Sequence, residues 1–253
     1  MHTQWPSTLW LVRHGQSAGN VARDAAEAQG LPMIDLTSRS IDTPLSPLGV
    51  QQSEALGQWF AGLPEGTGPE IVLTSPYARA HRTAELIAQQ AGLSGVRLRL
   101  DERLREKEFG ILDRYTRRGI EQTFPELAEQ RALVGKFYFR PPGGESWCDV
   151  ILRLRSALEM ITREYGGRRV LVVGHQVIVN CMRYLLEQMD ERQILDIDAR
   201  GDLPNCGVTS YRAPAGGAPD QPMQVDLVNF TAPLIEAQTP VTSEPDASTG
   251  AKP

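Results

Sequence analysis

The residues best suited to chemistry follow the first apolar run of the chain. Residues 8–12 read Thr-Leu-Trp-Leu-Val, which is typical of a buried strand, and Arg13, His14 and Gly15 come directly after them. Because ligands of open α/β sheets bind beyond the carboxyl ends of the strands, we expect Arg13 and His14 to face such a crevice. A guanidinium holds phosphate oxygens bidentately, and a neutral imidazole nitrogen can act as a nucleophile. The pair fits attack on a phosphoryl group, but so short a match also fits a strand end without a role.

A second histidine stands in the equivalent position after a second strand. Residues 168–173 form another strand-like run, and Gly174 and His175 follow it. The chain has only 4 histidines in 253 residues. Two of them directly after predicted buried strands are hard to ascribe to core packing.

A third predicted strand, residues 70–74, leads to Arg79. Ser75 is a favourable N-cap and Pro76 a favourable first helical residue, so we expect Arg79 near the N-terminus of a helix. Helix N-termini attract anions through their free N–H groups and the macrodipole. Three strand ends are therefore predicted to bring two arginines and two histidines to one side of a sheet.

In their order along the chain, these motifs resemble the histidine phosphatase superfamily, also called phosphoglycerate mutase-like. The resemblance spans residues 8–212, far more than any single motif. The matching segments are Arg13-His14-Gly15 with Ser17 and Asn20, then residues 42–49, 75–84, 104–106, 144–146 and 173–175.

The resemblance implies a phosphohistidine mechanism with His14 as the nucleophile and Glu106 as the proton donor. It implies that three residues hold the phosphoryl group, namely Arg13, Arg79 and His175. It also places Ser17 and Asn20 among the residues that bind substrate. Such a site stabilises the charge of a transferring phosphoryl group without a metal, and the sequence contains no obvious metal-binding motif. We therefore expect neither a metal nor a cofactor.

The proton donor has a rival two residues further on. Residues 105–108 read Arg-Glu-Lys-Glu, so Glu108 is the alternative to Glu106, and a run of charges in a loop is often merely solvated. The family spacing from Leu104 and Gly110 favours Glu106. We also expect five arginines on strand or helix faces to point to water: Arg97, Arg99, Arg153, Arg155 and Arg163.

The residues between Glu106 and His175 bear on the identity of the substrate. Mutases of the family carry histidine and tyrosine after the acid, whereas this chain has Lys107-Glu108-Phe109. Three residues are similar to those that bind a second phosphate in the fructose-2,6-bisphosphatase branch, namely Arg131, Lys136 and Gln176. Alternatively, Arg131 and Lys136 are solvated loop charges, since loop function transfers poorly between members of a fold.

We predict a metal-independent phosphatase that acts on small phosphate monoesters, among them sugar phosphates or bisphosphates. One alternative is a cofactor-dependent phosphoglycerate mutase. The other is a catalytically silent domain that binds phosphorylated ligands or partners, although the residues that such a domain would be expected to lose are all present.

Composition agrees with one soluble enzyme domain. Hydrophobic residues make up 41% and charged residues 23%, and the net charge of -5 argues against nucleic-acid or anionic-membrane partners. The 3 cysteines are too few for a disulfide framework. With no visible targeting or membrane-spanning segment, a cytoplasmic location is expected.

Strand and helix patterns alternate along the chain. Strands are predicted at 8–12, 71–74, 96–100, 169–173, 208–212 and 223–230. Helices are predicted to begin after Ser46 and Ser146 and to span 77–91, 176–188 and 191–197. This order predicts a three-layer α/β/α sandwich with a mostly parallel central sheet. Residues 1–230 form the predicted catalytic domain, and residues 231–253, rich in Pro, Thr and Ser, are predicted to be a disordered tail.

Overall fold

The fold is built on a sheet whose strand order is β3-β2-β4-β1-β5-β6. The computed structural model describes residues 4–93, 95–96, 98–214 and 221–243, and this sheet is six-stranded within them. The first four strands in that order are parallel, whereas β5 and β6 continue the sheet in antiparallel pairing. The strands are β1 (Thr8–Arg13), β2 (Ile71–Thr74), β3 (Leu98–Leu100), β4 (Arg169–Gly174), β5 (Val208–Arg212) and β6 (Gln224–Phe230).

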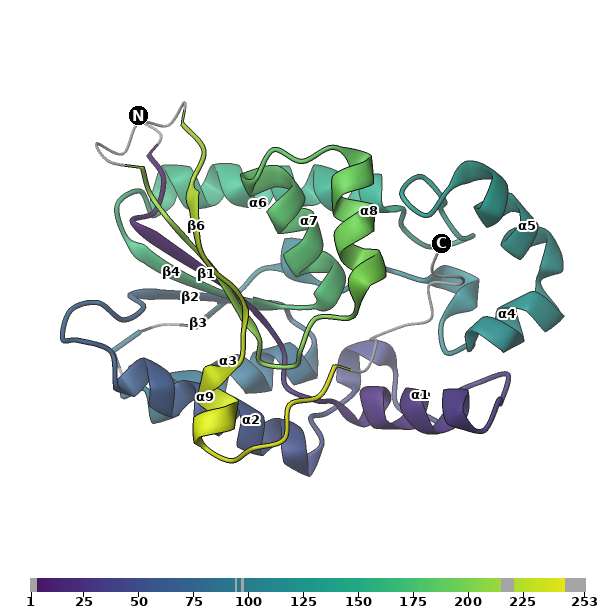
Figure 1. Ribbon diagram of the computed structural model, residues 1–253, viewed down its shortest axis with the longest axis horizontal. Helices are drawn as coiled ribbons and strands as arrows, with labels where there is room; N and C mark the ends of the chain where they lie inside the picture. Colours follow the sequence, from purple (N-terminus) through teal and green to yellow (C-terminus); the bar gives the residue numbers. More distant parts are fainter. Residues whose placement is uncertain (1–3, 94, 97, 215–220, 244–253) are drawn as a thin grey trace.

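Helices cover both faces of the sheet, which confirms the predicted three-layer α/β fold (Figure 1). One face carries α6 (Trp147–Glu164), α7 (Gln176–Leu186) and α8 (Glu191–Arg200). The other carries α2 (Pro47–Ala61), α3 (Ala78–Gln90) and α9 (Ala232–Glu236). The remaining helices are α1 (Ala18–Ala28), α4 (Arg117–Thr123) and α5 (Pro125–Val134).

Strand β1 is buried on both sides because it lies in the middle of the sheet. Leu9 and Leu11 belong to the apolar cluster under α6 and α7, whereas Trp10 and Val12 belong to the cluster under α2 and α3. Successive strand side chains point to opposite faces, so a continuous apolar run fills both cores.

Helices α4 and α5 form a cap that lies beside α1 and apart from the sheet (Figure 1). Thr116 caps α4 with its side chain, and Pro125 begins α5. The cap has a small apolar cluster of its own around Leu112, Ile120 and Phe139. The sequence pattern did not predict these helices, because α5 contains no buried residue and α4 is only 7 residues long.

The predicted disordered tail differs from the structure over residues 231–243. Leu234 of α9 is fully buried against the cluster under α2 and α3. Further on, Thr242 exchanges hydrogen bonds with Asn205, and Gln52 donates to the Pro240 carbonyl. These apolar and hydrogen-bonding contacts hold residues 231–243 against the domain. Residues 244–253 lie outside the described part of the chain.

Candidate active site

The candidate site lies where β1, β2 and β4 end side by side. Arg13 is in register with Gly174, and the His14 N–H donates to the Gly174 carbonyl at 2.9 Å. Ser75, the first residue after β2, donates its N–H to the Val173 carbonyl at 3.0 Å. Parallel strands thus bring His14 and His175 to one edge, as predicted, and Ser75 lies there with them.

Hydrogen bonds fix the orientation of the His14 ring. Nδ1 lies 2.7 Å from the Gly15 carbonyl oxygen, which only accepts, so Nδ1 carries the proton and Nε2 bears the lone pair. Arg79 donates its Nε–H to that Nε2 at 3.1 Å. The imidazole therefore presents an unprotonated nitrogen to a guanidinium that could hold an anion.

Close backbone packing holds the His14 loop in place. A Cβ on Gly15 would lie 2.4 Å from the Gly49 carbonyl oxygen, so no larger residue fits there. The Gly15 N–H donates to Thr83 Oγ1, and Asn205 donates to the His14 carbonyl, both at 3.0 Å. The loop is thus held from α3 on one side and from the segment before β5 on the other.

His175 faces His14 across the site. Their ring centroids lie 5.1 Å apart, and both side chains are fully buried. His175 Nε2 lies 2.8 Å from Ser75 Oγ, and its Nδ1 lies 3.6 Å from Glu106 Oε2. The second imidazole is therefore aligned between a hydroxyl and a carboxylate.

The two arginines are held differently. Arg13 is fully buried and donates to the Leu203 carbonyl. Arg79 lies in the first turn of α3, stacks over the Tyr77 ring and donates through Nη1 to the Ser40 carbonyl at 2.8 Å. The loop that carries Ser40 therefore contacts the Arg79 guanidinium.

The helix that carries Arg79 begins later than predicted. Its cap residue is Tyr77, without a side-chain cap hydrogen bond, and Pro76 precedes the cap. The Ser75 hydroxyl instead forms a hydrogen bond with His175 Nε2 and accepts one from the Tyr77 N–H. The position of Arg79 near the helix N-terminus agrees with the sequence prediction even though the cap does not.

Burial separates the two carboxylates that compete for the role of proton donor. Glu106 is 3% exposed and lies beside His175. The Glu108 side chain is 46% exposed, accepts a hydrogen bond from the Tyr77 hydroxyl at 3.0 Å and lies near Arg105. Glu106 is therefore the carboxylate placed at the histidines.

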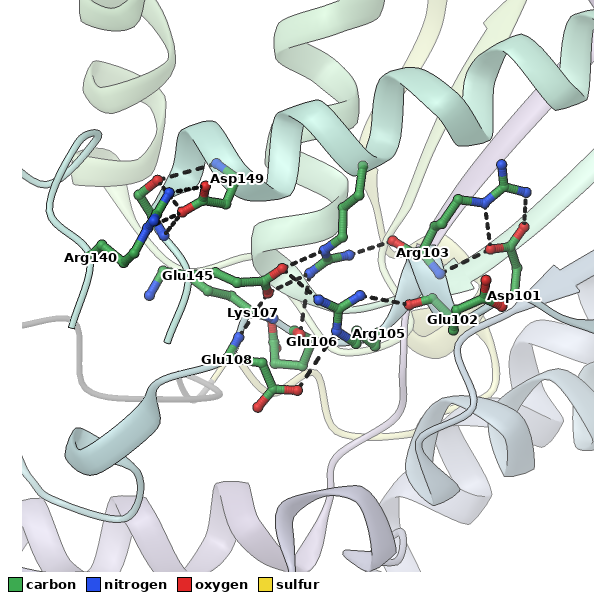
Figure 2. A network of polar contacts seen from close by, with 12 residues as sticks. Asp101, Glu102, Arg103, Arg105, Glu106, Lys107, Glu108, Arg140, Glu145 and Asp149 are labelled. Carbon is green, nitrogen blue, oxygen red and sulfur yellow. Dashed lines mark hydrogen bonds and ion pairs between the residues drawn. The ribbon is translucent and has the colours of Figure 1, made fainter. Parts of the chain in front are cut away.

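The segment that carries Glu106 is clamped by ion pairs that the sequence did not reveal (Figure 2). Glu145 accepts hydrogen bonds from Arg105 at 2.7 Å, from Arg153 at 2.9 and 3.0 Å, and from the Glu108 N–H at 3.0 Å. Arg153 also donates to the Glu106 carbonyl at 3.3 Å. Burial alone would raise the pKa of Glu145, but the hydrogen bond and charge of Arg153, together with the Glu108 N–H and the charge of Arg105, lower that pKa.

Arg153 corrects one sequence prediction. It was expected to face water, but its side chain is 11% exposed because the guanidinium turns back to Glu145 and two loop carbonyls. Arg99, Arg155 and Arg163 are exposed as expected, and Arg97 lies outside the described residues. Glu145 belongs to a segment that carried the family resemblance, and its place two residues before α6 was the signal available in the sequence.

Lys107 is buried rather than solvated. Its ammonium lies 4.3 Å from the centroid of the Phe109 ring, and the residue is 7% exposed. Burial, which outweighs the attraction of Glu106 and Glu145, lowers the pKa of Lys107 to about 8. A lysine that can lose its proton near neutral pH therefore adjoins Glu106.

The five residues expected to bind substrate do not all gather in one place. Ser17 and Asn20 close the capping box of α1, and Ser17 also lines a small pocket with Arg79. Arg131 and Lys136 line a larger cavity under the cap. Gln176 donates to Asp202 at 2.7 Å and is not among the residues that line that cavity.

Within the described ranges, no group of three or more His, Cys, Asp or Glu side chains is arranged to hold a metal ion. In the same part of the chain, no helix has the length and apolar character needed to cross a membrane.

The sequence matches a family model described as histidine phosphatase superfamily (branch 1) over residues 9–219. A 2,3-bisphosphoglycerate-dependent phosphoglycerate mutase of Methylobacterium radiotolerans is 29% identical, over 78% of this chain and 86% of that protein. A probable phosphoglycerate mutase of Salmonella paratyphi C is 33% identical, over 69% and 72% of the two chains.

Solved structures of similar fold include phosphatases. A mycobacterial glucosyl-3-phosphoglycerate phosphatase in complex with VO3 superposes with a TM-score of 0.66 at 25% identity, over 88% of this chain and 99% of that one. A putative alpha-ribazole-5'-P phosphatase of Escherichia coli, at 20% identity, has a TM-score of 0.69 over 89% and 97%. The second likeness concerns the fold alone.

Proposed function

Because the chain belongs to the histidine phosphatase superfamily, we propose that it hydrolyses phosphate monoesters through a phosphohistidine on His14. The observation that carries this proposal is the fixed His14 tautomer, with Nδ1–H donated to the Gly15 carbonyl and the Nε2 lone pair facing Arg79. A phosphatase of similar fold at 25% identity supports hydrolysis as the outcome.

In the first step, His14 Nε2 forms a bond to phosphorus while the bond between phosphorus and the ester oxygen breaks. Charge spreads over the equatorial oxygens of the phosphoryl group, where Arg13, Arg79 and His175 supply cationic and N–H donors. Glu106, in its protonated form, gives its proton to the leaving alkoxide. The alcohol then departs.

In the second step, water attacks the phosphohistidine. Glu106, now a carboxylate, takes a proton from that water, and the bond between Nε2 and phosphorus breaks. Inorganic phosphate leaves, and both His14 and Glu106 return to their starting protonation states.

A second acidic group on the substrate would meet Arg131. Of the three residues similar to the fructose-2,6-bisphosphatase branch, Lys136 is paired with Asp198 and Gln176 donates to Asp202. Arg131 keeps a buried Nη2 that has no hydrogen-bond partner among the described residues. Arg131 is therefore the residue that supports binding of a bisphosphate or another doubly anionic ester.

The curated relatives favour mutase activity as a second candidate. Two of them, at 29% and 33% identity, are phosphoglycerate mutases or probable ones. In a mutase the phosphoryl group on His14 would return to a second hydroxyl of the bound product instead of to water. Interconversion of phosphoglycerates in the presence of bisphosphoglycerate, faster than phosphate release, would identify that activity.

The proposal is tested with a panel of phosphate esters and a pair of histidine variants. We expect His14→Ala to abolish phosphate release from an aryl phosphate, because the nucleophile is lost. His81→Ala is the matched control, since that histidine lies on α3 with a 38% exposed side chain, and it should retain full activity. Activity in His14→Ala with an intact fold by circular dichroism would refute the mechanism.

A further inference from the structure

A cavity of about 530 Å³ lies between the α4–α5 cap and the main domain. Most of the residues that line it are apolar, including Leu112, Ile120, Leu127, Phe139, Trp147 and Leu195. Trp147 begins α6 and Leu195 lies on α8, so the domain forms one wall and the cap forms the other. The volume falls within the range of about 300–1,000 Å³ typical of small-molecule sites.

The cavity adjoins the reacting groups through the segment that carries the acid. Lys107, which lines the cavity, directly follows Glu106, and the Phe109 ring beneath its ammonium lines the cavity as well. Glu106, His14 and His175 do not line the cavity themselves, so an ester held at His14 would reach this space only with its organic part, past Lys107.

Most of the polar side chains around the cavity are already paired. Arg117 contacts Glu121 at 2.9 Å, and Lys136 contacts Asp198. These pairs leave Lys107 and Arg131 as the remaining polar side chains of the lining. Two cations cannot satisfy the many hydroxyls of a polyol, and a buried hydroxyl without a partner costs more than an apolar group in the same place. The lining of the cavity therefore suits a hydrocarbon group better than a polyol such as a sugar.

We propose that this cavity binds the organic part of the substrate and that this part is predominantly apolar. The proposal rests on the phosphatase function proposed above and narrows its substrate class to alkyl or aryl phosphate esters, with any acidic substituent directed to Arg131. Simple sugar phosphates of similar size are then poor substrates, because the apolar walls cannot replace their hydrogen bonds to water.

Hexyl phosphate and glucose 6-phosphate make the sharpest substrate comparison, since both are phosphate esters of six-carbon primary alcohols. We expect kcat/KM for hexyl phosphate to exceed that for glucose 6-phosphate by at least about tenfold. From ethyl to hexyl phosphate, kcat/KM should rise by up to about fourfold per buried methylene. Equal values across the chain-length series, or a preference for glucose 6-phosphate, would overturn the inference.

Two variants on one helix locate the effect. Leu127 lines the cavity and is partly buried, whereas Leu133 on the same helix is 88% exposed and lies outside the lining. Leu127→Asp should lower the ratio of hexyl to ethyl phosphate kcat/KM by at least about tenfold, and Leu133→Asp should leave that ratio unchanged. An equal effect of both changes would mean that the cavity does not hold the organic part.

Binding of phosphonates separates this inference from the proposed function. Hexyl and ethyl phosphonate cannot be hydrolysed, and calorimetry measures their affinities without turnover. Tighter binding of the hexyl compound together with no hydrolysis of any ester would refute the phosphatase and leave the cavity assignment standing. Hydrolysis of esters without any chain-length preference in turnover or phosphonate binding would refute the cavity assignment alone.

Discussion

At the scale of single residues, burial gives two neighbouring carboxylates different environments. Glu106 is enclosed beside His175, whereas Glu108 reaches solvent and binds the Tyr77 hydroxyl. Only an acid within reach of the leaving oxygen can protonate it, so the proposed proton donor is chosen by position and not by residue type.

Replacing each acid by its amide tests this assignment. Glu106→Gln should lower kcat/KM by about a hundredfold or more for alkyl phosphates, whose alkoxides need a proton, and by much less for an activated aryl phosphate. Glu108→Gln keeps a hydrogen-bond acceptor for Tyr77 and should change both substrates by less than about threefold. A larger loss in the Glu108 variant would reassign the acid.

Lys107 gives the site a predicted pH dependence. Burial lowers its pKa from 10.5 to about 8, so the folded chain releases this proton before the unfolded chain does. Below pH 8 the ammonium is charged and attracts an anionic ester, and above pH 8 it is neutral. Between pH 8 and 10.5 the unfolded state binds more protons at this residue, so its contribution to stability rises with pH.

We therefore expect KM for an alkyl phosphate to rise by several-fold as pH increases from 7 to 9.5. Lys107→Met should have a high KM that does not change over that range, and Lys107→Arg should keep a low KM to higher pH, because guanidinium stays protonated. Steady-state kinetics with varied substrate concentration, at constant ionic strength and several pH values, measure KM for the parent protein and both variants. An identical KM–pH profile in the parent and Lys107→Met proteins would exclude this role for Lys107.

At the scale of elements, the C-terminal segment is connected to His14, the proposed nucleophile, by hydrogen bonds. Gln52 donates to Thr242 Oγ1 at 2.9 Å, Thr242 donates to Asn205 Oδ1 at 3.0 Å, and Asn205 donates to the His14 carbonyl at 3.0 Å. Gln52 also accepts the Gln16 N–H at 2.9 Å. The segment around Thr242 therefore positions the loop that carries His14.

Truncation tests this positioning role. A chain that ends at Gln238 loses the contacts of Pro240 and Thr242 and should show kcat lowered by about tenfold, with KM within about twofold. A chain that ends at Ser243 is the control and should behave like the full chain. Thr242→Val should reproduce part of the loss, since each hydrogen bond contributes about 1 kcal/mol. Equal activity of the two truncated chains would show that the contacts are dispensable.

The sequence predicted the elements that bury continuous or periodic apolar patterns. Strand β1 and helix α6 were recognisable because Leu9 to Val12 and the stripe through Leu154 fill the core. Helix α5 was missed because it buries no residue fully, and the C-terminal segment was missed because its contacts are with residues far away in the chain. Arg153 was misjudged because its partners come from the loop around Glu106 and from Glu145.

At the scale of the whole molecule, the sheet brings chemistry from distant parts of the sequence to one edge. His14 and His175 are separated by most of the domain, yet their rings lie 5.1 Å apart because β1 and β4 are neighbours. The cap and the C-terminal segment then enclose and support this edge. The proposed site therefore depends on the pairing of β1 with β4 as well as on the two histidines themselves.

The most direct test of the central claim is to trap the covalent intermediate and locate its phosphate. Brief mixing with labelled aryl phosphate and quenching in base should yield a base-stable, acid-labile phosphoprotein. Mass spectrometry should place the phosphate on His14, and phosphorus NMR should assign it to Nε2, the nitrogen that bears the lone pair. Turnover without a phosphoprotein, or phosphate on any other residue, would contradict the mechanism.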